Sequence, residues 1–480
     1  MTAFDLIVQG GRVATAADVS TCDIGIKNGR VTALAERLED AGRIIDATGM
    51  TVTPGGVDGH CHLDQPSMDG SVSADDFLTG THSAAAGGTT TVIPFALQMR
   101  GHSLHEAIED YHQRAQGKAL IDYAFHLIVT DPTPQVCGQE LPALIQDGYS
   151  SFKIYMTYDD LKLDDRQILD VLSVARRHQG MVMIHAENSD CISWLTDRLE
   201  EEGKIEPRYH ATSRPRPVER EATHRAITLA ELLDVPILIV HVSARDAVWE
   251  IQRAQARGLK IFGETCPQYL FLTQDDLDKP GFEGAKCMCS PPPRDKEDQQ
   301  VIWDGLSNGT FQILSSDHSP TRYNDPKGKM LRGTKESFRW VPNGVPGIET
   351  RMALLFSEGV GKGRIDLPTF VALTATNAAR LYGLYPRKGT IAVGADADIV
   401  IWDDEREVTI TNDLLHHNVD YTPYEGMSIR GWPGTVLSRG DVVWENREVS
   451  GEPGRGQFLP CAQPEKAVPA GRPVTNFQPA

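Results

Sequence analysis

The sequence predicts an α/β protein in which a (β/α)8 barrel, the TIM-barrel fold, carries a small β-sandwich domain built from both ends of the chain. From about residue 54 to residue 380, short apolar segments alternate with amphipathic ones, which is typical of parallel strands joined by crossover helices. Eight apolar segments of this kind occur, and eight βα units in succession close into a barrel. Both ends of the chain instead alternate apolar and polar residues between turns, which favours a half-buried antiparallel sheet.

The predicted barrel strands are short and apolar. They are Val57–His62, Thr89–Phe95, Tyr123–Val129, Ser151–Met156, Met181–Ala186, Pro236–Val242, Lys260–Glu264 and Gln312–Asp317. Between them, the helical spacing of apolar residues is clearest over residues 164–178 and 222–233.

The predicted β-sandwich combines short strands from near both termini. At the N-terminal end these are Leu6–Val8, Asp23–Ile26 and Arg30–Leu34, with turns at Gly10-Gly11 and at Asn28-Gly29. Residues 394–402, 433–437 and 439–444 have the same texture. We therefore predict four units: 1–53 and 381–451 as the two parts of the β-sandwich, 54–380 as the barrel, and the proline- and glycine-rich 452–480 as an extended tail.

Composition disfavours several classes of function. The 480 residues carry a formal net charge of -19, so we expect neither a nucleic-acid partner nor an anionic-membrane partner. No segment is long and apolar enough to cross a bilayer, and the N-terminus lacks a basic region followed by a long apolar run. The eight cysteines lack the regular spacing of a disulfide framework, so a reducing cytoplasm is the expected location.

Polar side chains lie near the ends of several predicted barrel strands. In a barrel the carboxyl ends of all strands meet at one rim, where the chemistry takes place. His60 and His62 are two residues apart on one strand, so both side chains project the same way. The donors expected at this rim are His60, His62, Lys153, His185, His241 and Asp317. Their convergence predicts a metal centre rather than core histidines satisfied by hydrogen bonds.

Lys153 leaves two interpretations open. A buried, unpaired ammonium among metal ligands is costly, so the amine must change its chemistry or find an anion. By adding carbon dioxide it becomes a carbamate that can bridge two metal ions; alternatively, Lys153 is an ordinary lysine paired with Asp317 or another carboxylate. Four imidazoles, a bridging anion and a carboxylate suit two Zn²⁺ ions, with Mn²⁺ or Co²⁺ as further candidates. Asp317 can then take a proton from a water activated by the metal ions and pass it to a leaving nitrogen.

Seven stretches carry a more specific pattern: residues 54–64 (PGGVDGHCHLD), 151–158 (SFKIYMTY), 182–188 (VMIHAEN), 239–243 (IVHVS), 289–292 (CSPP), 342–349 (PNGVPGIE) and 385–394 (YPRKGTIAVG). In these stretches the chain resembles the dihydropyrimidinase/hydantoinase branch of the amidohydrolase superfamily. The resemblance implies a zinc-dependent cyclic amidase that opens dihydropyrimidine or hydantoin rings to N-carbamoyl amino acids. It also implies a homotetramer, or else a homodimer.

The resemblance implies a role for each site residue. The implied ligands of one zinc are His60, His62 and Asp317, those of the other are His185 and His241, and a carbamylated Lys153 bridges the two. Tyr158 corresponds to a tyrosine that stabilises the oxyanion, and Ser290 and Asn343 to positions whose backbone groups bind the cyclic amide. The expected catalytic residues are therefore Asp317 and Tyr158.

Some positions depart from the family pattern. Gln65 and Ser67 stand where hydantoinases carry more apolar residues, which predicts a more polar pocket for the exocyclic substituent, unless both side chains face solvent. His318 is a candidate acid or base, but neighbours on a strand face opposite sides, which favours a structural role.

The alternatives to a hydantoinase are other members of the superfamily. Dihydroorotase-like enzymes place an arginine where this chain has Asp64, whose charge would repel a substrate carboxylate, so that activity ranks low and allantoinase only slightly higher. An imidase is a further cyclic-amidase alternative. A non-catalytic scaffold relative would have lost metal ligands, whereas all six positions are filled here.

Overall fold

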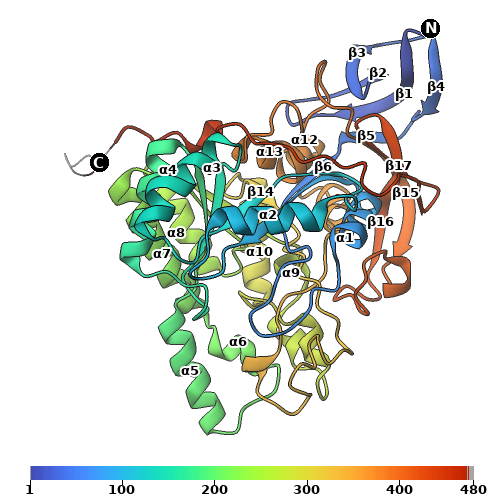
Figure 1. The fold of residues 1–480 in the computed structure, drawn as a ribbon. Coiled ribbons are helices and arrows are strands. Elements are labelled where there is room, and N and C mark those ends of the chain that lie inside the picture. The colour runs from blue at the N-terminus through green and yellow to red at the C-terminus, as the bar shows by residue number, and fades with distance from the viewer. Residues whose placement is uncertain (1, 473, 475–480) are drawn as a thin grey trace.

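The computed structural model describes residues 2–472 and 474, and two sheets organise it (Figure 1). The first is a parallel sheet of nine strands, in which neighbours follow the order of the chain. Its strands are β6 (Gly56–Cys61), β7 (Thr89–Leu97), β8 (Asp122–Tyr123), β9 (His126–Ile128), β10 (Ser151–Tyr155), β11 (Met181–His185), β12 (Ile237–Ile239), β13 (Ile261–Thr265) and β14 (Ile313–Leu314). Both β8 and β9 pair with β7; β8 overlaps the single strand predicted at Tyr123–Val129 by one residue, and β9 lies within it. The predicted barrel strands are confirmed, with ends shifted by a few residues.

Hydrogen bonds between the first and last strands close this sheet into a barrel. The amide of Asp317 donates to the carbonyl of His60 at 2.8 Å, and the amide of His62 donates to the carbonyl of His318 at 2.8 Å. Cys61 and His318 form a parallel bridge between the same two segments. The closure therefore places His60, His62 and Asp317 side by side at the carboxyl ends of the strands.

Helices surround the barrel. They are α1 (Phe77–Ala86), α2 (Leu104–Ala115), α3 (Leu141–Gln146), α4 (Asp165–His178), α5 (Ser189–Glu201), α6 (Tyr209–Ser213), α7 (Arg216–Leu233), α8 (Arg245–Ala256), α9 (Gln268–Phe271), α10 (Lys296–Ser307), α11 (Arg351–Leu355), α12 (Leu367–Val371) and α13 (Asn377–Leu381). In α4, the side chain of Asp164 accepts a hydrogen bond from the amide of Gln167 and caps the first turn. Ile168, Val171 and Leu172 of α4 are buried, as their spacing predicts.

The second sheet joins both ends of the chain. It comprises β1 (Phe4–Ala14), β2 (Val19–Lys27), β3 (Arg30–Ala35), β4 (Ala41–Asp46), β5 (Thr51–Pro54), β15 (Ile399–Thr409), β16 (Ser428–Ser438), β17 (Asp441–Glu445) and β18 (Glu448–Val449). Antiparallel pairing of β5 with β15 connects the N-terminal strands to the C-terminal ones. The prediction that both ends build one β unit beside the barrel is confirmed, whereas the four predicted unit boundaries stay predictions.

The predicted turn at Gly10-Gly11 is wrong, because β1 continues through both residues. The register of β1 against β2 shifts between Val8 and Gly11, which marks a bulge. Gly10 adopts a φ of 68°, and its amide donates to the carboxylate of Asp23 at 2.7 Å. The turn at Asn28-Gly29 is confirmed: both residues have positive φ, 50° and 75°, as a tight hairpin requires.

The described part of the C-terminal tail, residues 452–472, runs along the barrel (dark red in Figure 1). The amide of Leu459 donates to the carbonyl of Tyr123 at 2.7 Å, at the beginning of the barrel strands. Leu459 and Cys461 join the buried cluster that contains Val57 and Leu238. The tail therefore covers the amino-terminal end of the barrel, opposite the rim. No helix in the described residues combines the length and apolar character needed to span a bilayer.

A buried ion cluster connects the barrel to the second sheet. The ammonium of Lys388, which is 0% exposed, lies 2.6 Å from the carboxylate of Asp122 and 2.7 Å from that of Asp398. Asp122 belongs to β8, and Asp398 immediately precedes β15. A third carboxylate, of Asp396, lies 3.1 Å from the same ammonium. Removing the cation would leave buried carboxylates without their shared partner.

We expect Lys388→Met to lower the free energy of unfolding by about 3–5 kcal/mol, because breaking a buried ion pair strands its partner. Urea unfolding followed by circular dichroism measures this change. Lys27→Met is the matched control, since Lys27 pairs with Asp5 at the surface and should change stability little. Equal stability of the two variants would contradict a structural role for the cluster.

Candidate metal centre and active site

A cavity of about 570 Å³ opens at the carboxyl ends of the barrel strands. Every residue predicted for the site lines it: His60, His62, Lys153, Tyr158, His185, His241, Ser290, Asp317 and Asn343. These residues come from distant parts of the chain, and the barrel strands and the loops that follow them bring them together. Their chemical roles stay predictions.

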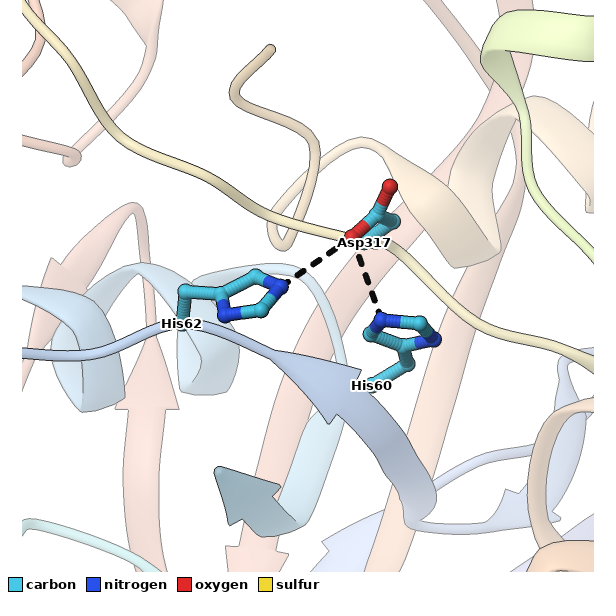
Figure 2. A group of neighbouring side chains, drawn as sticks. All are labelled: His60, His62 and Asp317. Carbon is cyan, nitrogen blue, oxygen red and sulfur yellow. Dashed lines mark ion pairs between the residues drawn. The ribbon is translucent and has the colours of Figure 1, made fainter. Parts of the chain in front are cut away.

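His60, His62 and Asp317 form one compact group of donors (Figure 2). The Oδ1 atom of Asp317 lies 3.3 Å from Nε2 of His60 and 3.3 Å from Nε2 of His62. One donor atom from each residue falls within 4.8 Å of the others. Within the described part of the chain, this is the one group of three or more His, Cys, Asp or Glu residues so close together. Two imidazoles and a carboxylate match the nitrogen and oxygen ligands that Zn²⁺ accepts.

His185 and His241 lie beside this group. His185 ends β11 and His241 follows β12, and their ring centroids are 4.4 Å apart. The ring of His241 also lies 5.3 Å from that of His60. The buried Nδ1 atom of His241 has no hydrogen-bond partner among the described residues. Since a buried polar atom is rarely left without a partner, this nitrogen fits a bound ligand.

Lys153 lies between the two groups of histidines. Its Nζ atom is 3.1 Å from Nε2 of His60, and within the described residues it forms no ion pair with a carboxylate. Burial lowers the pKa of Lys153 to about 8, against the opposing charges of Glu264 and Asp317. The alternative of an ordinary lysine paired directly with Asp317 therefore finds no support in these contacts.

Three of the four histidines use one ring nitrogen to hold an outer partner. Nδ1 of His60 lies 2.6 Å from Glu264, and Nε2 of His185 lies 2.8 Å from Glu187. Nδ1 of His62 lies 2.6 Å from the amide oxygen of Gln65. The other ring nitrogen of each histidine does not contact this outer partner. Metal-binding histidines have the same arrangement, with one nitrogen on the metal and the other on an outer partner.

These outer partners could not be identified from the motifs in the sequence. Glu264 could have been chosen as a candidate site residue, because it is the last residue of the predicted seventh strand and so lies at the same rim. Glu187 lies only two residues beyond His185, and it pairs with Arg214 at 2.7 Å. The contacts of these acidic side chains with the imidazoles arise from the folded structure and do not follow from residue spacing in the sequence.

The electrostatics of the cavity favour neutral His60 and His241 and an ionised Asp317. Burial moves the pKa values of His60 and His241 well below their ordinary value. Burial alone would raise the pKa of Asp317, but the neighbouring His60 and His62 hold it below its usual value. Neutral imidazole and carboxylate are the forms that bind metal ions.

Three of the predicted site residues have left-handed backbone conformations. Tyr158 has a φ of 67°, Asp317 of 46° and His241 of 38°. Side chains other than glycine avoid this region, and residues held there cluster at active sites. The strained turns aim these side chains into the cavity immediately after their strands.

Tyr158 faces the loop that carries Asn343. Its hydroxyl donates to Oδ1 of Asn343 at 3.5 Å, and its ring centroid lies 5.4 Å from that of His185. Burial raises the pKa of Tyr158, so its hydroxyl keeps its proton. The group is therefore a hydrogen-bond donor beside the metal-ligand candidates.

The loops carrying Ser290 and Asn343 are tied together. The amide of Gly344 donates to the carbonyl of Met288 at 2.8 Å. The buried Lys329 donates to the carbonyls of Pro342 and Gly344 at 3.0 and 2.9 Å. These bonds give the two loops a fixed spacing across the cavity. No pattern in the sequence singles out Lys329.

The departures from the family pattern also have definite places. His318 turns away from the cavity, with Nε2 3.1 Å from Asp75 and Nδ1 accepting from the amide of Gly347 at 3.1 Å, which agrees with a structural role.

Asp64 does not line the cavity but pairs with Arg114 at 3.0 Å. Its charge therefore does not face the cavity, so Asp64 would not repel a substrate carboxylate as predicted. The arginine of dihydroorotase-like enzymes is nevertheless absent from this position. Gln65 and Ser67 both line the cavity, and the amide oxygen of Gln65 contacts Nδ1 of His62 at 2.6 Å.

Known proteins share both the sequence and the fold of this chain. The model of the amidohydrolase family matches residues 51–443. The D-hydantoinase of Ralstonia pickettii is 46% identical over 456 residues, which cover 95% of this chain and 98% of that protein. A D-hydantoinase structure superposes with a TM-score of 0.93 at 45% identity, covering 96% of this chain and 99% of the other. The dihydropyrimidinase of Brevibacillus agri gives a TM-score of 0.92 at 44% identity, covering 95% and 98%. This chain therefore belongs to the amidohydrolase family.

Proposed function

We propose that this protein hydrolyses a cyclic amide bond in hydantoins and dihydropyrimidines and releases N-carbamoyl amino acids. One observation carries the proposal: four imidazoles, a lysine and a carboxylate converge in a single cavity at the carboxyl end of the barrel. Relatives named D-hydantoinase at 46% identity support this substrate class and a preference for the D configuration.

The donors in the cavity would hold two Zn²⁺ ions per chain. His60, His62 and Asp317 would bind one ion, His185 and His241 the other, and a carbamylated Lys153 would bridge them. The absence of a carboxylate paired with Lys153 among the described residues supports the carbamate. Mn²⁺ and Co²⁺ suit the same nitrogen and oxygen donors. When bound, such a pair of ions lowers the pKa of a shared water and polarises a carbonyl.

The chain's own groups then bind the ring and move protons. Asp317, ionised before reaction, accepts the proton of the attacking water and passes it to the leaving ring nitrogen. The Tyr158 hydroxyl donates a hydrogen bond to the carbonyl oxygen as negative charge develops there. Backbone groups of Ser290 and Asn343 form hydrogen bonds with the amide of the ring. These bonds orient the ring carbonyl toward the proposed metal ligands.

We expect Tyr158→Phe to lower kcat by about 100- to 1,000-fold, as for the loss of one oxyanion donor. Bound metal should stay at the wild-type level, because Tyr158 is not a proposed ligand. Steady-state kinetics together with metal analysis measure both quantities. Tyr155→Phe is the matched control: its ring also packs on His185, with centroids 5.4 Å apart, but it has no role in the reaction proposed here. Similar kcat values for the two variants would exclude Tyr158 as the oxyanion donor.

A substrate panel tests the proposed function. It contains dihydrouracil, both enantiomers of 5-substituted hydantoins and cyclic imides, with allantoin and dihydroorotate included as discriminating substrates. We expect D-hydantoins and dihydrouracil to yield N-carbamoyl products, detected by chromatography. Turnover of only allantoin, dihydroorotate or imides would reassign the substrate, and turnover of none by metal-loaded protein would refute the proposal.

We further propose a homotetramer, with a homodimer as the alternative, located in the cytoplasm. The family resemblance supports the assembly, and the unpatterned free cysteines support a reducing compartment. Light scattering coupled to size-exclusion chromatography distinguishes the tetramer from the dimer and from the 52.7 kDa chain.

A further inference from the structure

His62 is held on two sides by neighbours that fix its ring. Its plane lies nearly parallel to the ring of Phe95, with centroids 5.1 Å apart and an interplanar angle of 28°. Its Nδ1 atom contacts the amide oxygen of Gln65 at 2.6 Å, and its Nε2 atom lies 3.3 Å from Asp317. An amide oxygen only accepts hydrogen bonds, so Nδ1 must carry the ring proton. A ring with its single proton on Nδ1 has its lone pair on Nε2, on the side of Asp317 and His60.

The partner of His62 differs in chemical type from the partners of His60 and His185. His60 and His185 contact the buried carboxyl groups of Glu264 and Glu187. Arg214 and His185 hold the pKa of Glu187 at about 2, whereas burial raises the pKa of Glu264 to about 8. A carboxylate partner raises the basicity of an imidazole ligand, whereas a neutral amide mainly orients it. His62 is also the more exposed of the two histidines beside Asp317, at 17% against 1% for His60. The orientation of His62 therefore depends strongly on Gln65.

A turn fixed from outside the site brings Gln65 back over His62. Asp64, between them, has a left-handed φ of 49°, which an ordinary side chain adopts only when neighbours hold it there. Arg114 of α2 donates to both the backbone oxygen and the carboxylate of Asp64, at 3.1 and 3.0 Å. The amide of Asp64 donates to the carbonyl of Asp75 at 2.9 Å. Helix α2 thus sets the turn that places the amide of Gln65.

From these contacts we infer that Gln65 is a positioning residue for the metal centre. It holds His62 in the tautomer with Nε2 unprotonated and directed toward His60 and Asp317, with which His62 would share an ion. The inference rests on the proposed binuclear centre and concerns only the affinity of the ion bound by His62. Arg114 acts through the same turn, one step further from the metal.

The test measures metal affinity, not turnover. Metal-free protein is titrated with Zn²⁺ in competition with a chromophoric chelator. For Gln65→Leu, which keeps much of the side-chain volume but cannot accept a hydrogen bond, we expect one of the two ions to bind about 10- to 100-fold more weakly. For Gln65→Glu, which keeps the acceptor and adds charge, we expect affinity at least equal to wild type. Recovery in the glutamate variant separates the hydrogen bond from a general disturbance of the loop.

Ser67→Ala is the matched control in the same loop, because the Ser67 hydroxyl bonds to Asp69 and Ser71 and, among the described residues, to no histidine. Its Zn²⁺ affinities should equal those of the wild type. Wild-type affinity for both ions in Gln65→Leu, or an equal loss in Ser67→Ala, would overturn the inference. Wild-type protein that binds no zinc would instead refute the proposed centre, and with it the inference, so the two failures are distinguishable.

Discussion

Lys153→Ala is expected to lose both metal ions and all measurable ring-opening activity. The substitution would remove the proposed bridging anion and leave only the histidines and Asp317 to hold the two proposed cations. Lys153 is 0% exposed and its amine contacts His60 at 3.1 Å, so the substitution empties the buried space beside His60. Metal content per chain and turnover of a hydantoin measure the two effects. A Lys153→Ala protein with two zinc ions and normal turnover would refute the bridge.

Lys153→Arg separates the two interpretations of this lysine. A guanidinium keeps the positive charge and can pair with carboxylates, but it stays protonated and cannot form the carbamate. We therefore expect the arginine variant to be as metal-free and inactive as the alanine variant. If Lys153 served only as a cation, the arginine variant would retain most of its activity. Wild-type protein stripped of metal should regain activity with Zn²⁺ only when bicarbonate is supplied.

Asp317→Asn is expected to lower kcat by about 100- to 10,000-fold, the range of a lost general acid–base group. Asparagine has nearly the same shape but cannot accept the water's proton at neutral pH, and it is a weaker metal ligand. Because Asp317 lies 3.3 Å from both His60 and His62, metal at this group should also bind less tightly. Kinetics at saturating Zn²⁺ distinguish the two losses.

Asp160→Asn is the matched control for Asp317, since Asp160 lines the outer cavity and has no proposed part in proton transfer. We expect its kcat to stay within about tenfold of wild type, because a distant exposed charge is screened. Zinc-saturated Asp317→Asn with a kcat equal to that of Asp160→Asn would show that another group moves the proton.

The barrel and the position of the six donor residues at its rim could be predicted because both depend on local patterns. An apolar segment that ends in histidine, such as Met181–His185, indicates both a strand and the position of its last residue at the rim. The parallel arrangement then brings the ends of separate strands together without any knowledge of side-chain contacts. Tyr158, Ser290 and Asn343 had no such local signal, and only the family resemblance pointed to them.

The features that escaped prediction depend on contacts between distant segments. The bulge at Gly10 requires Asp23 of the next strand to receive its amide, so an isolated Gly-Gly pattern is misinterpreted as a turn. The orientation of Gln65 depends on Arg114 of α2, about fifty residues further along the chain. The sequence alone shows neither contact, because each forms only in the packed structure.

Metal stoichiometry measured together with activity tests the central claim most directly. Wild-type protein, purified with zinc and bicarbonate, is analysed by mass spectrometry for metal per chain while hydantoin turnover is followed through chelation and reconstitution. We predict two ions per chain, activity that disappears with them, and recovery when Zn²⁺ and bicarbonate return. Folded protein that binds no metal under these conditions, or that opens the ring equally well without it, would contradict the account.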